Sequence, residues 1–110
     1  MKCDEFYDIL NKWKAIPEED LKKVINVLDH LENNYGLEYW KSKRGSHYVI
    51  KHKLFKRDEL LRQFKLNPRE CMNGELSIPA KKGKKVKKIY LKRLISVSEL
   101  LEFAKKEELL

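Results

Sequence analysis

Apolar residues recur at helical spacing over the first third of the chain. Between residues 4 and 14 they form one stripe, which predicts an amphipathic helix. Ile16-Pro17 interrupts the stripe, because the residue before a proline is disfavoured in helical conformation. A second helix is predicted from Pro17, with the acids at 18–20 in its first turn and one apolar face buried. Gly36 is predicted to end this helix as a left-handed cap.

After the second helix the spacing changes to the alternation that is typical of strands. Residues 37–41 and 47–53 predict the two strands of a β-hairpin, which turns at residues 44–46. A third short strand is predicted at 75–79, where a proline closes it. The connection at 54–73 is long for a compact domain, so we expect it to have structure of its own.

Two further helices are predicted at the end of the chain. A basic loop follows the third strand, and apolar spacing predicts a helix over 86–95. Ser98 is a good N-cap for a separate last helix that reaches residue 110.

The sequence therefore predicts a single α+β domain over residues 1–110. Its core, at about 18–95, is a three-stranded antiparallel sheet packed by helices. The segment 54–73 is an insert between the second and third strands, and the helices at 4–14 and 98–110 are additions to the core.

Charge is distributed unevenly along the chain. Residues 41–95 carry eighteen Lys and Arg against four acids, a net charge of +14, whereas residues 1–40 and 96–110 are net acidic. A central segment this basic is the electrostatic pattern of a protein that binds a phosphate backbone. The alternative is a solvated, lysine-rich surface.

Several classes of protein and site do not fit the sequence. It has no apolar run of about 18 residues, so we expect no membrane span. Residues 1–5 lack the apolar core of a signal peptide. Cys3 and Cys71 have no metal-ligand spacing and form no disulfide framework, and a thiol nucleophile is not expected. We expect a reduced, cytoplasmic protein without metal or cofactor.

His47 is the candidate for chemistry. It opens the second predicted strand directly after the turn at 44–46, with Lys43, Arg44 and Lys51 nearby in sequence. An unperturbed histidine has a pKa near ~6.5, so it can exchange a proton at cellular pH. RNA carries its own nucleophile, the 2′-hydroxyl, and its cleavage needs a base to take that proton and cations to stabilise the charge that develops on phosphorus. The alternative is a structural or merely exposed histidine.

Other aromatic and imidazole side chains have less specific patterns. His52, at the end of the strand, could contact phosphate, although a surface role is favoured, and His30 is expected on a helix surface. Of Tyr39 and Trp40, one belongs in the core and the other could stack a base, with core packing favoured for both.

Two segments together resemble HicA-type toxins. The first is Gly45-Ser46-His47 with the extended strand that ends at Lys51-His52, and the second is Leu76-Ser77-Ile78-Pro79 with the basic loop and the lysine-rich helix over 86–94. The resemblance covers residues 18–53 and 74–95. Many members of that family have a second histidine where this chain has Tyr48.

The resemblance implies a fold and an activity. HicA-like proteins have an α-β-β-β-α arrangement similar to the double-stranded-RNA-binding domain, cleave RNA without a metal ion, and are held inactive by a HicB antitoxin. By this resemblance His47 is the catalytic base, and Gly45 and Ser46 form the turn that presents it. The residues expected to hold RNA are Lys43, Arg44, Ser46, Lys51, Lys81, Lys82, Lys84, Lys85, Lys88 and Lys92.

Three functions fit the sequence. The first is a HicA-like, metal-independent endoribonuclease. The second is a module that binds double-stranded RNA by shape without cleaving it. The third is a protein-interaction adaptor, in which the acidic ends and the basic centre pair with a partner or with other copies.

Overall fold

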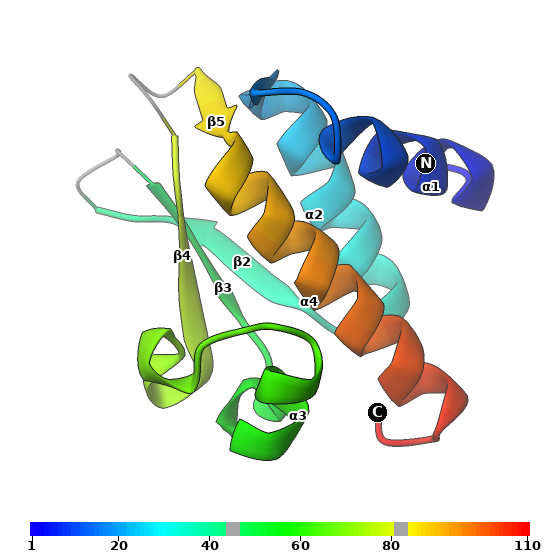
Figure 1. Ribbon diagram of the computed structural model, residues 1–110, viewed down its shortest axis with the longest axis vertical. Coiled ribbons are helices and arrows are strands. Elements are labelled where there is room, and N and C mark those ends of the chain that lie inside the picture. Colours follow the sequence, from blue (N-terminus) through cyan, green and yellow to red (C-terminus); the bar gives the residue numbers. More distant parts are fainter. Residues whose placement is uncertain (44–46, 81–83) are drawn as a thin grey trace.

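A three-stranded antiparallel sheet in the order β2–β3–β4 forms one layer of the protein (Figure 1). The strands are β2 (Glu38–Lys41), β3 (His47–Lys51) and β4 (Glu75–Pro79). The computed structural model describes residues 1–43, 47–80 and 84–110. The predicted α+β class, with a three-stranded antiparallel sheet and helices, is confirmed.

The helices form a second layer on one side of this sheet. Figure 1 shows α2 (Leu21–Tyr35) and α4 (Lys88–Lys106) side by side, with α1 (Cys3–Trp13) beside them at the N-terminus. The predicted cap is confirmed, because Gly36 follows the last residue of α2 with a left-handed φ of 75°. The apolar faces of these helices and one face of the sheet share a single hydrophobic core, which includes Leu28, Leu31, Ile50, Leu76, Ile78, Leu91 and Leu94.

A second, two-stranded sheet departs from the prediction. It pairs β1 (Glu18–Asp20) with β5 (Lys85–Lys87) in antiparallel register. The acids at 18–20 therefore form a strand and not the first turn of a helix. The helix predicted from residue 86 begins two residues later, because Val86 alternates with two exposed lysines and is fully buried as a strand residue.

The separate C-terminal helix predicted at 98–110 is wrong, since α4 runs without a break from Lys88 to Lys106. Ser98 is not an N-cap but a fully buried residue within this helix. Its hydroxyl donates to the carbonyl oxygen of Leu94 at 2.8 Å, one turn earlier, so the polar group is satisfied without ending the helix.

The insert has structure of its own, as predicted. It contains the short helix α3 (Asp58–Gln63) and three single 3₁₀ turns, η1 (Lys53–Lys56), η2 (Pro68–Glu70) and η3 (Met72–Gly74). Its apolar side chains join the main core, so the insert is packed on the domain and closes the core at one end of the sheet. These side chains are Leu54, Phe55, Leu60, Leu61 and Leu66.

Candidate functional site

The two faces of the three-stranded sheet differ in burial. Register and strand alternation place Ile50, Leu76 and Ile78 toward the helices, where they are fully buried. The residues between them lie on the opposite side, which we call the open face. No described side chain of the open face is buried. Its three cross-strand rows are Ser42, His47 and Pro79; Trp40, Val49 and Ser77; and Glu38, Lys51 and Glu75.

His47 lies at one end of the open face, as the first residue of β3. Its Cα pairs with that of Pro79 on β4, and its carbonyl oxygen accepts a hydrogen bond of 2.9 Å from Ser42 N. The Ser42 Oγ lies 3.5 Å from His47 Nδ1, at the outer limit of a hydrogen bond. The strand ladder thus fixes the backbone of His47 from both sides, while its imidazole is partly exposed.

Tyr48, at the position where many HicA-like proteins have a second histidine, lies on the other face of the sheet. It pairs with Lys41 and Ile78, and its ring centroid lies 6.3 Å from that of Tyr39. Because successive strand residues point to opposite faces, a side chain at position 48 does not share the open face with His47.

Among the described residues, the candidate RNA-binding lysines do not form a single cluster. Lys43 is exposed just after β2, at the same end of the sheet as His47. Lys51 lies at the other end of β3, about 13 Å along the strand from His47. There its cross-strand neighbours are Glu38 and Glu75, which offset its charge.

The remaining candidates belong to the β1–β5 sheet and to α4. Lys84 and Lys85 are exposed, and Lys85 forms an ion pair with Asp20 that raises the pKa of Lys85 and lowers that of Asp20. Lys88 is partly exposed at the first position of α4, whereas Lys92 is exposed one turn later. Five candidates lie outside the described residues: Arg44, Gly45, Ser46, Lys81 and Lys82.

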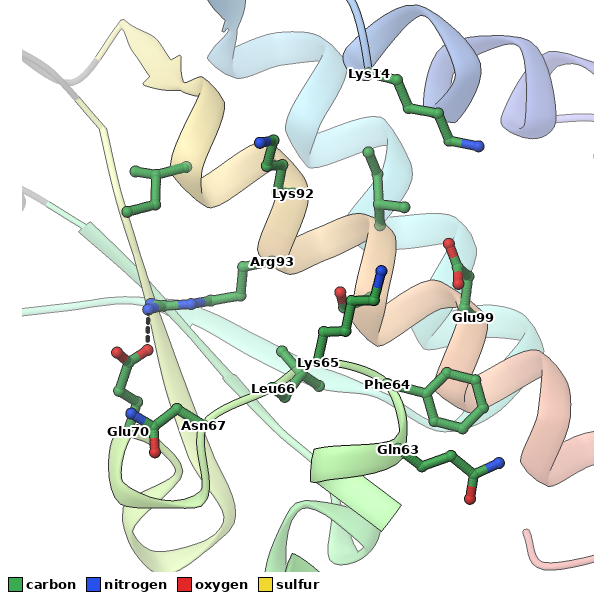
Figure 2. A pocket seen from close by; sticks show the side chains of 13 residues that line it. Lys14, Gln63, Phe64, Lys65, Leu66, Asn67, Glu70, Lys92, Arg93 and Glu99 are labelled. Atoms are coloured by element: carbon green, nitrogen blue, oxygen red, sulfur yellow. Dashed lines mark hydrogen bonds and ion pairs between the residues drawn. The ribbon is translucent and has the colours of Figure 1, made fainter. Parts of the chain in front are cut away.

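Lys92 lines a cavity of about 710 Å³ between α4 and the insert (Figure 2). Lys14, which follows α1, and Lys65 of the insert also line this cavity. Arg93 also lines it, but its guanidinium is held by Glu70 and by the carbonyl oxygen of Ser77 (2.6 Å). Lys92 therefore belongs to a surface on the helix side of the sheet, away from the open face.

The expected surface positions of His52 and His30 are wrong. His52 is only 6% exposed: its Nδ1 accepts from Leu54 N at 3.1 Å, and its Nε2 donates to the carbonyl oxygen of Tyr35 at 3.0 Å. His30 is also buried and stacks on Phe6, with ring centroids 4.2 Å apart. Burial lowers the pKa of both imidazoles. Both are structural residues.

Because His30 and His52 are buried, we expect the folded protein to lose stability in mild acid. Their folded pKa values lie below the ordinary value, so as the pH falls through about 6.5 the unfolded chain takes up protons that the folded chain does not. The free energy of unfolding, measured with urea, should therefore fall between pH 7.5 and pH 5. In His52→Asn, which keeps a side-chain acceptor for Leu54 N, the fall should be smaller. An unchanged pH dependence in this variant would contradict the assignment.

The prediction of core packing for both Tyr39 and Trp40 is wrong for Trp40. Tyr39 faces the helices, where its hydroxyl donates to Asp29 of α2; burial and this bond raise its pKa to about 12. Trp40 lies on the open face and is 40% exposed. Strand alternation from Leu37 predicts this position. Leu37 and Tyr39 lie on the core side, so Trp40, one residue further, lies on the opposite face.

The described residues were also searched for a reactive thiol, a metal site and a membrane-spanning helix. Burial raises the pKa of the Cys71 thiol to about 11, which disfavours a thiolate there. In the ranges 1–43, 47–80 and 84–110, no group of three or more His, Cys, Asp or Glu side chains is arranged to hold a metal ion. Within the same ranges, every helix is too short or too polar to cross a membrane.

Comparison of the chain with protein-family models, with curated proteins and with solved structures found no match. The distinctive chemistry of the described surface is thus His47 on the open face of an antiparallel sheet, with exposed Lys43 at the same end and exposed Trp40 one row away.

Proposed function

We propose that this protein is a HicA-like, metal-independent endoribonuclease in which His47 is the general base. The observation that carries the proposal is the position of His47: it is held by ladder contacts at the end of β3, on a sheet face that helices do not cover (Figure 1). When the insert and β5 are left out, α2, β2, β3, β4 and α4 follow one another in an order that supports an arrangement like that of the double-stranded-RNA-binding domain.

The proposed reaction uses the nucleophile that RNA carries. The His47 imidazole takes the proton of a 2′-hydroxyl, the 2′-oxygen forms a bond to the adjacent phosphorus, and the bond from phosphorus to the 5′-oxygen breaks. The leaving 5′-oxygen takes a proton from water. The products are a 2′,3′-cyclic phosphate and a 5′-hydroxyl, and neither an oxidant nor a metal is needed to balance the step.

Lysines at the His47 end of the sheet would offset the charge that develops on the phosphoryl oxygens. Lys43 is exposed at that end, and Lys84, directly before β5, is also exposed, whereas Lys85 is already paired with Asp20. Lys51 has carboxylates on both neighbouring strands, so we assign it a smaller part in binding RNA. We place the reaction in the cytoplasm, and propose that a HicB-like antitoxin would inhibit it by covering His47.

The test is cleavage of a long single-stranded RNA by the purified chain in EDTA, followed by analysis of the new ends. We expect cleavage that EDTA does not reduce, fragments that end in 2′,3′-cyclic phosphate, and no cleavage of DNA of the same sequence. Cleavage that requires added magnesium, or that leaves 5′-phosphate ends, would contradict the proposal.

The second candidate is a module that binds RNA without cleaving it, which the same α-β-β-β-α order and basic segment favour. That function predicts no fragments, and an affinity for RNA that falls steeply with salt concentration because phosphate contacts release counterions.

A further inference from the structure

Trp40 is unusually placed for a tryptophan. The chain has two, and the other, Trp13, is completely buried. Trp40 instead lies 40% exposed on β2, an edge strand of the sheet, directly across from Val49. A large aromatic side chain at a solvent-facing sheet position has little packing to gain there, and tryptophan is enriched at binding surfaces.

The register relates Trp40 to the candidate catalytic residue. Val49, the cross-strand partner of Trp40, is two residues after His47 on β3, so Trp40 and His47 are diagonal neighbours on the same face. Diagonal pairs on adjacent strands are typically about 7–8 Å apart, within reach of an aromatic side chain. A ligand that stacks on the Trp40 indole therefore extends to the His47 imidazole.

The third residue of the Trp40 row leaves the surface flat. Ser77, across from Val49 on β4, is small and exposed. A flat ring can therefore lie on the indole without displacing a bulky neighbour, whereas a helix of a partner protein would find no groove in this row.

The two ends of the open face differ in charge. Exposed Lys43 follows β2, at the His47 end of the sheet. At the other end, Glu38 and Glu75 flank Lys51. A chain of phosphates is attracted toward the first end and not toward the second.

We infer that Trp40 stacks a base of single-stranded RNA whose adjacent phosphate lies at His47. This inference rests on the proposed function and adds a residue that binds its substrate. In a duplex, the base faces are already stacked within the helix and are closed to an aromatic side chain, so only an unpaired nucleotide can use Trp40. Trp40 is a binding residue for this reaction, and His47 does the chemistry.

The test compares affinities for a single-stranded RNA and a blunt RNA duplex, by fluorescence anisotropy of labelled RNA. All variants carry His47→Ala so that the RNA stays intact. Trp40→Ala should weaken binding of the single strand by about 5- to 150-fold, the range expected for loss of one stacked base, and change duplex binding less than about two-fold. Trp40→Phe, which keeps an aromatic face, should recover most of the affinity.

Tyr7→Ala is the matched control, because Tyr7 is 44% exposed but lies on α1, in the helix layer. It should bind both RNAs as the parent does. Tryptophan fluorescence gives a second readout: single-stranded RNA should quench the parent, and the quenching should vanish in Trp40→Phe, because Trp13 is buried.

Two results would overturn the inference. One is unchanged single-strand affinity in Trp40→Ala, and the other is an equal loss of affinity for both RNAs. If the affinity is unchanged and Trp40→Ala also loses self-association in sedimentation, the surface is assigned to protein contacts. Failure of the proposed function is separate, since it is seen as no EDTA-resistant cleavage by the chain with His47 intact.

Discussion

Replacing His47 with alanine should lower the rate of RNA cleavage by about 10²- to 10⁴-fold, the usual contribution of a general base. RNA affinity should change only a few-fold, because phosphate and base contacts are made by other side chains. The rate is best measured under single-turnover conditions in EDTA with protein in excess, so that chemistry and binding are separated. His47 is partly exposed at a strand end, so the variant should remain folded.

Two further variants define this result. Ser77→Ala changes an exposed residue of the same face, one row from His47, and should cleave at the parental rate. Ser42→Ala removes the hydroxyl 3.5 Å from Nδ1 and should have an effect much smaller than that of His47→Ala, since it only positions the ring. If His47→Ala and Ser77→Ala both cleave RNA at the parental rate, His47 is not the base.

Trp13→Ala should lower the free energy of unfolding by about 3–5 kcal/mol, the largest effect on stability that we expect. The indole is completely buried, and its Nε1 donates to the Glu19 carboxylate at 3.1 Å. Glu19 is itself 6% exposed and accepts a second hydrogen bond from Asp20 N at 2.9 Å. Truncation thus creates a cavity and also removes a hydrogen bond from a buried carboxylate.

Urea unfolding monitored by circular dichroism measures this loss. Trp13→Phe keeps one aromatic ring in the core but loses the N–H donor and part of the indole, so it should cost less than Trp13→Ala, about 1–3 kcal/mol. A loss below about 1 kcal/mol in Trp13→Ala would mean that the site repacks and does not anchor the fold.

Trp13 also connects the core to the basic segment. Its hydrogen bond to Glu19 holds β1 in place, and Glu19 pairs with Val86 of β5. Backbone hydrogen bonds then fix the lysines on either side of β5: Leu21 N donates to the carbonyl oxygen of Lys84 at 2.9 Å, and Lys88 N donates to that of Pro17 at 2.8 Å. The position of these cations therefore depends on the N-terminal helix.

Long, strongly periodic segments of the fold could be predicted from the sequence. The helix at 4–14, the hairpin and the third strand have clear periods, and the structure contains α1, β2, β3 and β4 there. β1 and β5 could not be predicted in this way, because three residues are too few to show a period. Their pairing joins segments more than sixty residues apart, and that contact decides their conformation.

The candidate site was predictable in part. The alternation of β3 and the turn before it locate His47 at the first strand residue, where the structure has it. The burial of His30 and His52 has no local signal, since their partners, Phe6 and the Tyr35 carbonyl, come from distant segments. For Trp40, strand alternation in the sequence predicts the open face, whereas the size and apolarity of the side chain favour the core.

We propose that this chain cleaves RNA through the 2′-hydroxyl, with His47 as base and without a metal ion. A pair of RNA oligonucleotides in EDTA, identical except for one 2′-deoxyribonucleotide on the 5′ side of a mapped cleavage site, tests this proposal. We predict that the all-ribose strand is cut at that bond and that the substituted strand is not, while its other sites are still cut. Equal cleavage of that bond in both strands, or cleavage of neither, would contradict the claim.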